Sequence, residues 1–149
     1  MTDAPATADA DDDRPGATKQ RSMVRERYST IARESASCCE PTNSCSAAAR
    51  VSAKEYGYSD RELDAVAGAA NLNLGCGNPT GIASLAAGDS VLDLGSGGGF
   101  DCFLAAREVG ANGRVIGVDM TPEMVEKARD NVAANNVSNV EFRLGEIEH

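Results

Sequence analysis

One cysteine of this sequence, Cys76, lies between two glycines in the segment LGCGNP. Such a glycine pair is typical of a loop that binds phosphate through free backbone N–H groups, and a thiol adds nothing to that function. A thiolate is instead a preferred ligand of soft, thiophilic ions. A free cysteine can also serve as a small buried residue in a turn. The segment by itself leaves both interpretations of Cys76 open.

Four other cysteines are candidates to act with it: Cys38, Cys39, Cys45 and Cys102. The first three lie in a polar stretch broken by Pro41, which predicts a loop. The fourth lies among apolar residues of a predicted helix, which favours core packing. Five thiols are an odd number, and in a reducing compartment this favours free thiols or ligands over disulfides. Zinc is a poor fit, because the first three cysteines lack the CxxC spacing and the sole histidine is the last residue, His149.

A second segment of chemical interest is VLDLGSGGG, residues 91–99, where an apolar strand turns through glycines toward a predicted helix. Gly95 would permit the tight turn, and Gly97 would allow a ligand to approach the backbone beside the helix N-terminus. The dinucleotide pattern GxGxxG would require a glycine at position 100, where this sequence has Phe100. The GxGxG spacing therefore argues against a nicotinamide or flavin site.

Two carboxylates accompany this loop. Asp93 lies inside the apolar strand, and a carboxylate buried there needs a partner such as a ligand ammonium group or backbone amides. Asp119 ends the next predicted strand, where a carboxylate can accept hydrogen bonds from both hydroxyls of a ribose. Together with the glycines, these positions resemble motif I and the ribose-binding acid of the class I S-adenosylmethionine-dependent methyltransferases.

This resemblance implies a cofactor site for S-adenosylmethionine. The cofactor-binding residues that it implies are Asp93, Gly95, Ser96, Gly97, Asp119, Met120 and Glu146. Glu146 would lie beside the adenine ring, although a solvated carboxylate at the end of a strand is an equally good interpretation.

The elements that would position these residues alternate between strands and helices. Strands are predicted at residues 90–95, 114–120 and 139–148, with helices at residues 99–110 and 121–136. Thr121 is the predicted N-cap of the second helix and Pro122 its first residue. The buried stripe of that helix is expected to consist of Met124, Val125, Ala128 and Val132. This alternation predicts an α/β fold with a parallel, Rossmann-like sheet over residues 90–149.

The preceding residues form two further segments. Residues 1–22 are polar and acidic without an apolar period, which predicts a disordered tail. Residues 23–89 are expected to form a helical and cysteine-loop segment. It would begin with an amphipathic helix over residues 23–36, whose apolar face consists of Val24, Tyr28 and Ile31.

Two helix starts are predicted within this segment. The tetrad SDRE, residues 59–62, is a capping box, and the short helix after it would bury Leu63, Val66 and Ala70. Asn78 and Pro79 are expected to open a helical turn that runs toward Leu85.

The charge balance limits the partners. Fourteen basic and 23 acidic residues in a chain of 149 give a net charge of 14 − 23 = −9, which argues against nucleic acid or an anionic membrane as a partner. No apolar run approaches the ~18 residues of a membrane helix, and the N-terminus lacks the features of a secretory signal. We therefore expect a cytoplasmic protein.

Four segments together extend the resemblance: LGCGNP, VLDLGSGGGFDCFLAA, VIGVDMTPEM and VEFRLGEIE. From about Met23 to His149 the sequence resembles the N-terminal part of the arsenite methyltransferases. The resemblance implies that Cys76 binds trivalent arsenic together with Cys38 or Cys39, with Cys45 as a third possibility. It further implies that arsenite or its thiol conjugates are methylated in a detoxification reaction supported by a thiol reductant. Members of that family continue beyond the third strand, so we expect this sequence to correspond to an incomplete domain.

The implied chemistry is simple in physical terms. Arsenic held by thiolates keeps a lone pair, which is the nucleophile, and the methyl carbon of the sulfonium is the electrophile. The protein has to align the two and exclude water. No general base is required, because arsenic carries no proton. Two alternatives stay open: a methyltransferase for another small molecule in which the cysteines are structural, and a non-catalytic arsenic-binding fragment.

Overall fold

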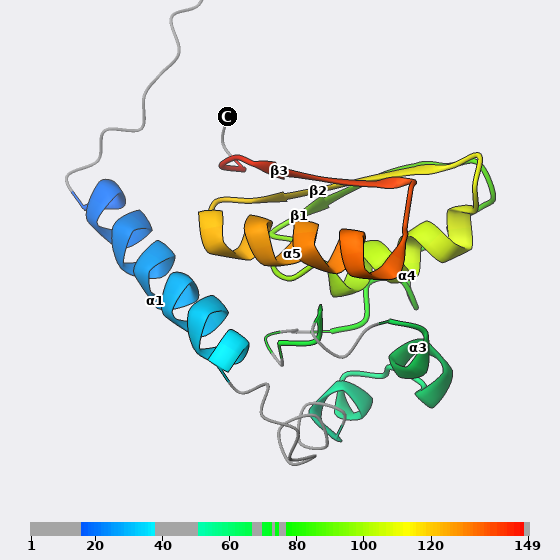
Figure 1. Cartoon of the computed structure of the whole chain (residues 1–149), viewed down its shortest axis with the longest axis horizontal. Helices are drawn as coiled ribbons and strands as arrows, with labels where there is room; N and C mark the ends of the chain where they lie inside the picture. The colour runs from blue at the N-terminus through cyan, green and yellow to red at the C-terminus, as the bar shows by residue number, and fades with distance from the viewer. Residues whose placement is uncertain (1–15, 38–50, 67–69, 73, 75–76, 148–149) are drawn as a thin grey trace, which may run out of the picture.

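The computed structural model of the protein describes residues 16–37, 51–66, 70–72, 74 and 77–147. Within these ranges no helix is long and apolar enough to cross a membrane. Three strands and two helices at the C-terminal side build a sheet layer and a helix layer, and further helices lie at the N-terminal side (Figure 1).

The sheet consists of three parallel strands in the order β1-β2-β3, namely β1 (Ser90–Leu94), β2 (Arg114–Asp119) and β3 (Val140–Leu144). Helices α4 (Phe100–Val109) and α5 (Pro122–Asn135) connect them, and both lie on the same face of the sheet (Figure 1). The predicted α/β architecture with a parallel sheet is confirmed. The carboxyl ends of all three strands consequently meet at one edge, where ligands of such sheets bind.

The core lies between the sheet and the two helices. Helix α4 buries Cys102, Phe103 and Val109, and α5 buries Met124, Val125 and Ala128 as predicted. In α5 the buried stripe also includes Asn131, whereas Val132 is only partly buried. A side-chain carbon at Gly117 would lie 2.5 Å from the Phe142 ring, so the missing side chain lets this ring lie against the centre of β2.

Helix α1 (Ala17–Ser37) begins inside the segment that was predicted to be a disordered tail, so that prediction is wrong for residues 17–22. Its predicted apolar face is also wrong in part, because Val24 and Tyr28 are 41% and 38% exposed. Ser29 and Ala32 are buried instead, on the face that packs against α5. Ser29 and Arg33 of this helix contact Glu123 of α5, and an apolar periodicity does not indicate such polar contacts.

The capping box is confirmed at α3 (Asp60–Ala65): the Glu62 N–H donates to the Ser59 hydroxyl, and the Ser59 N–H donates to the Glu62 carboxylate. Leu63, Val66 and Ala70 are buried as predicted, but α3 ends at Ala65 and Val66 is extended, so of the three only Leu63 lies on this helix. Asn78 caps a turn through its Oδ1, which accepts from the Gly81 N–H at 2.8 Å. This turn is a single one and ends before Leu85, so the predicted helical run is shorter than expected.

Candidate functional site

The glycine loop between β1 and α4 folds over the end of β2. The N–H groups of Gly95 and Ser96 both donate to the Val118 carbonyl oxygen, at 2.8 and 3.0 Å. Gly97 has a φ of +51°, and a side-chain carbon built there would meet no atom within 4 Å. The backbone at Gly97 thus faces open space, which a ligand could occupy.

Asp119 at the end of β2 lies directly against this loop. Its Oδ2 accepts from the Gly97 N–H at 2.9 Å, and its Oδ1 accepts from the Thr121 N–H at 2.8 Å. Thr121 is the N-cap residue of α5, but its side chain forms no capping hydrogen bond. An ionised carboxylate offers about four acceptor positions, so two remain for hydroxyl donors of a ligand.

Asp93 points from β1 toward α4, where burial raises the pKa of its carboxyl group. The Cys102 thiol lies 3.1 Å from Asp93 Oδ2 and donates to it. Burial, followed by the charge of Asp93, raises the pKa of this thiol, so it stays protonated and acts as a donor. Cys102 therefore packs in the core, as its sequence context suggested, and is also a partner of Asp93. No cation lies against this carboxylate in the part of the chain that the structure describes.

The remaining predicted cofactor residues differ in their surroundings. Ser96 lines the pocket described below, and its hydroxyl is buried and has no hydrogen-bond partner within the described ranges. Met120 follows β2 and is partly buried. Glu146, after β3, accepts from Arg25 of α1 at 2.6 Å, and Arg21 lies 4.0 Å away.

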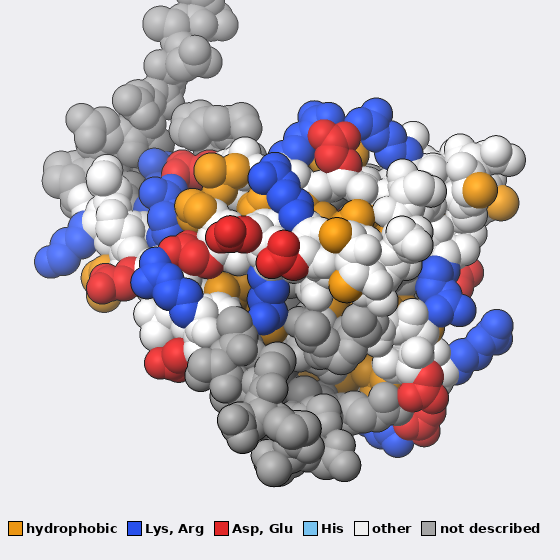
Figure 2. Space-filling view, in the orientation of Figure 1, with side chains coloured by type: hydrophobic (Ala, Val, Ile, Leu, Met, Phe, Trp, Pro, Cys, Tyr) orange, Lys and Arg blue, Asp and Glu red, His pale blue; other side chains and the backbone are white. Residues whose placement is uncertain are grey.

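Helix α1 is attached to this edge of the sheet by charged groups. Besides the contacts of Glu146, the Ser29 hydroxyl donates to Glu123 at 2.6 Å, and Arg33 pairs with the same carboxylate. The Ser29 hydrogen bond, backbone N–H groups and Arg33 lower the pKa of Glu123 to about 2. Figure 2 shows basic and acidic side chains interspersed over α1 and the start of α5. Glu146 thus has a partner on α1, which the sequence did not indicate.

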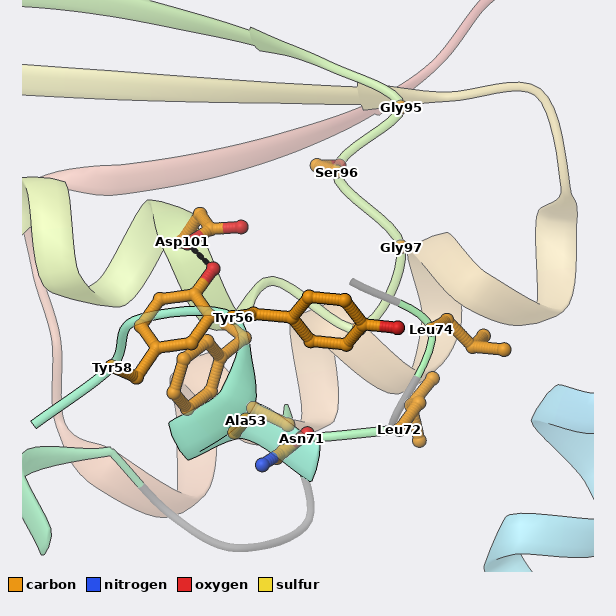
Figure 3. Close-up of a pocket in the computed structure, with 13 residues that line it drawn as sticks. Ala53, Tyr56, Tyr58, Asn71, Leu72, Leu74, Gly95, Ser96, Gly97 and Asp101 are labelled. Carbon is orange, nitrogen blue, oxygen red and sulfur yellow. Dashed lines mark hydrogen bonds between the residues drawn. The ribbon is translucent and has the colours of Figure 1, made fainter. Parts of the chain in front are cut away.

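A pocket of about 110 Å³ lies beside the glycine loop, between it and the segments around residues 53–58 and 70–74 (Figure 3). Its walls include Tyr56, Leu72 and Leu74 on one side and Gly95, Ser96 and Gly97 on the other. Ligand pockets usually measure roughly 300–1,000 Å³. This pocket is therefore large enough for only one end of a typical small-molecule ligand.

Sequence reasoning missed two residues near this site, one that contacts the glycine loop and one that contacts the first turn of α4. The buried Asn131 side chain of α5 donates to the Gly98 carbonyl oxygen at 3.1 Å. Tyr58 directs its hydroxyl at the pocket wall, 2.6 Å from Asp101 Oδ1 and 2.8 Å from the Gly77 carbonyl oxygen. A polar residue on the apolar face of a predicted helix is the signal that would have identified Asn131. Tyr58 follows no periodicity, so its sequence context gives no such signal.

The predicted arsenic ligands Cys38, Cys39, Cys45 and Cys76 lie outside the described residues. Gly77 directly follows Cys76 in the sequence, and it is described. Its carbonyl oxygen accepts from the Tyr58 hydroxyl, which also lies against Asp101 in the first turn of α4.

Comparisons with known proteins find similarity to methyltransferases. Residues 85–149 match a family described as a methyltransferase domain. The chain is 55% identical over 138 residues to an arsenite methyltransferase of Halobacterium salinarum, across 87% of this chain and 35% of that protein. It is 48% identical over 65 residues to an arsenite methyltransferase of Aquipseudomonas alcaligenes, across 41% of this chain and 19% of that protein.

Among solved structures, the chain resembles an arsenic(III) S-adenosylmethionine methyltransferase of Chlamydomonas reinhardtii at 36% identity and a TM-score of 0.44. That match covers 67% of this chain and 32% of the other. The chain thus spans about a third of the length of the Halobacterium relative, which it matches over most of its own length.

Proposed function

The chain resembles the arsenite methyltransferases over most of its length, and on that premise we propose that it binds S-adenosylmethionine and thiol-bound trivalent arsenic for methyl transfer between them. The observation that carries the choice of arsenic over another small molecule is the 55% identity to the Halobacterium arsenite methyltransferase across 87% of this chain. The fold and the glycine loop alone support only the coarser assignment to methyltransferases.

The residues at the strand ends fit S-adenosylmethionine. Asp119 is oriented by two backbone N–H groups and has acceptor positions left for the ribose hydroxyls. The open backbone at Gly97 gives space for the ligand. Asp93 is a partly buried carboxylate near the same loop, and an ammonium group would be a suitable counter-charge for it. When bound, S-adenosylmethionine supplies a methyl carbon that is electrophilic because it is attached to a sulfonium.

The thiols would hold arsenic as the substrate. We expect Cys76 to act with Cys38 or Cys39, and Cys45 is a third possible ligand, because soft ions prefer thiolates. Leu72, Leu74 and Tyr56 line the pocket beside the glycine loop and would exclude water from the path of the methyl group. Arsenic has no proton to lose, so the reaction needs no protein base. Transfer of the methyl group to the arsenic lone pair would release S-adenosylhomocysteine and formally oxidise arsenic by two electrons, and a thiol reductant would return it to the trivalent state. Such a reaction would serve arsenite detoxification.

Titration of the chain with arsenite in the presence of S-adenosylhomocysteine tests this proposal. Cys76→Ser should abolish tight arsenite binding and change the affinity for S-adenosylmethionine by less than about twofold, because a hydroxyl is a hard, poorly ionised replacement for a thiolate. Cys102→Ser is the matched control: a serine hydroxyl can still donate to Asp93, so both affinities should be kept.

Three results would argue against the proposal in different ways. Arsenite binding that depends on Cys102 and not on Cys76 would reverse the assignment of the ligands. Binding of S-adenosylmethionine without arsenite would favour another small-molecule substrate. Binding of both without methyl transfer, in a chain extended by the remaining length of the Halobacterium relative, would favour a non-catalytic arsenic-binding role.

A further inference from the structure

Asn131 is the polar member of an otherwise apolar stripe on helix α5. It is 5% exposed, and the other buried residues of this helix are Met124, Val125 and Ala128. A buried amide lowers stability unless it is hydrogen-bonded, and asparagine is a weaker helix former than alanine or leucine. An apolar side chain would therefore suit this position better if packing were its only role. Such a departure from the local pattern is typical of a functional position.

The Asn131 side chain reaches from α5 to the glycine loop. Its Nδ2 donates to the Gly98 carbonyl oxygen at 3.1 Å. The N–H of the same peptide group belongs to Gly99 and donates to the Ser96 carbonyl oxygen at 2.9 Å. The peptide group between Gly98 and Gly99 is thus held at both ends, by α5 at its oxygen and by the turn of the loop at its nitrogen.

The peptide group between Ser96 and Gly97 is held in the same way. Its carbonyl oxygen accepts from Gly99, and its N–H donates to Asp119 at 2.9 Å. The peptide group of Gly97 and Gly98 lies between these two fixed groups. Within the described ranges, neither the Gly97 carbonyl oxygen nor the Gly98 N–H has a hydrogen-bond partner.

This free peptide group lies at the pocket beside the loop. Gly97 and Gly98 both line the pocket, and Figure 3 shows the loop passing along it from Gly95 to Gly97. One acceptor and one donor of the backbone are therefore available to a ligand, and their orientation depends on the fixed peptide groups on either side.

We propose that Asn131 is a positioning residue for S-adenosylmethionine: by holding the Gly98 carbonyl oxygen, it orients the free Gly97–Gly98 peptide group for the ligand. This inference rests on the proposed function, because it assumes that the glycine loop binds S-adenosylmethionine. Asn131 is buried and does not line the pocket, so it acts through the backbone and not by contact with the ligand. Binding groups that are oriented in advance give a higher affinity.

The first test compares the parent chain with Asn131→Leu and, as a matched control, Val125→Ala on the same face of α5. Calorimetric titration measures the affinity for S-adenosylmethionine, and urea unfolding measures stability. Leucine has the same branching as asparagine but no donor, so Asn131→Leu should weaken binding by about three- to tenfold, in line with the loss of one hydrogen bond. Val125→Ala leaves a cavity and should lower the unfolding free energy, but its affinity should stay within about twofold of the parent.

Rescue by a proton separates positioning from a merely structural role. Asn131→Asp keeps the shape of the side chain, and burial raises the pKa of such a carboxyl group, so at pH 5 its O–H can donate to Gly98. At this pH the affinity of Asn131→Asp for S-adenosylmethionine should lie within about twofold of the parent, while Asn131→Leu stays about three- to tenfold weaker. As the pH rises and the carboxyl group ionises, the affinity of Asn131→Asp should fall at least to that of Asn131→Leu. Each variant is compared with the parent at the same pH, so that the titration of Asp93 and Asp101 near the loop cancels.

An unchanged affinity in Asn131→Leu would overturn the inference. An equal loss in Val125→Ala would also overturn it, as would an Asn131→Asp protein that binds S-adenosylmethionine no better than Asn131→Leu at pH 5. A parent chain that does not bind S-adenosylmethionine would instead contradict the proposed function.

Discussion

The Asp119 carboxylate accepts a hydrogen bond from the N–H of Gly97, which precedes it by 22 residues and belongs to the neighbouring loop. The carboxylate and the glycine loop therefore hold each other at the edge of the sheet. A ligand that binds one of them meets the other in a fixed position.

Asp119→Ala should weaken S-adenosylmethionine binding by about 1.5–3 kcal/mol, the loss expected for a charged hydrogen-bond acceptor. At 25 °C this corresponds to a dissociation constant that is about 10- to 150-fold higher. Calorimetric titration of the variant and the parent measures the difference. Asp119→Asn keeps one acceptor oxygen and should lose less. Equal affinities of the alanine variant and the parent would remove Asp119 from the cofactor site.

The stability of the fold should depend on pH through Asp101. Burial raises the pKa of its carboxyl group to about 6. The hydrogen bond from Tyr58 lowers this pKa by a smaller amount, and the charges of Asp93 on β1 and Glu62 on the first turn of α3 raise it further. Between about pH 4 and pH 6 the folded state then binds more protons than the unfolded state, so this group destabilises the fold as the pH rises. Asp101→Asn should remove this contribution.

Urea unfolding of the parent and of Asp101→Asn at pH 4.5 and pH 7 measures the effect. The unfolding free energy of the variant relative to the parent should be larger at pH 7 than at pH 4.5. Asp130→Asn, on the exposed face of α5, serves as the control substitution. A difference between Asp101→Asn and the parent that is the same at both pH values would show that Asp101 is not perturbed.

Loss of Arg25 should loosen helix α1. Arg25 pairs with Glu146 at 2.6 Å, and a partly exposed ion pair contributes about 0.2–1 kcal/mol. In Arg25→Ala we expect amide hydrogen exchange in α1 to become up to about fivefold faster. High salt should reduce the difference by screening. Arg27→Ala, on the exposed side of the same helix, is the control and should leave exchange unchanged. Equal exchange in the two variants would mean that other contacts hold α1.

The edge of β1 that does not pair with β2 has no strand beside it within the described part of the chain. Leu92 and Leu94 on this strand are 61% and 49% exposed, and they belong to the sheet face opposite α4 and α5. Exposed apolar edges associate with one another. The 149-residue chain should therefore self-associate in sedimentation experiments.

Leu92→Lys should reduce this association, because a charge on an edge strand opposes pairing. Ile82→Lys, at a residue that is 87% exposed in the turn outside the sheet, is the control and should not. A chimera with the remaining length of the Halobacterium relative should be monodisperse. A monodisperse 149-residue chain would contradict this prediction.

The sequence predicted the parts of the fold that depend on local pattern. The strand bearing Asp93, the turn at Gly95 and the end of α4 at Gly110 agree with the structure, because alternating apolar runs and glycines determine them locally. The apolar stripe of α5 was likewise correct apart from Val132. Such features require no knowledge of what packs against them.

Contacts between distant segments could not be predicted in this way. The face of α1 was assigned from Val24 and Tyr28, whereas Ser29 faces α5 because its hydroxyl binds Glu123. The contact between Tyr58 and Gly77 joins residues whose spacing carries no periodic signal. The partner of a polar side chain depends on the assembled fold. The sequence pattern of a single segment therefore does not predict that partner.

Gly117 has a consequence for ligand binding that reaches beyond the packing of Phe142. A side-chain carbon there would also lie 2.8 Å from the Ser96 hydroxyl. The absence of a side chain at Gly117 therefore allows the glycine loop to pack closely against β2. Because its contact with β2 already restrains the loop, the loop loses little further conformational freedom when a ligand binds on its other side. The entropic cost of ordering this loop is thereby met during folding and not during binding.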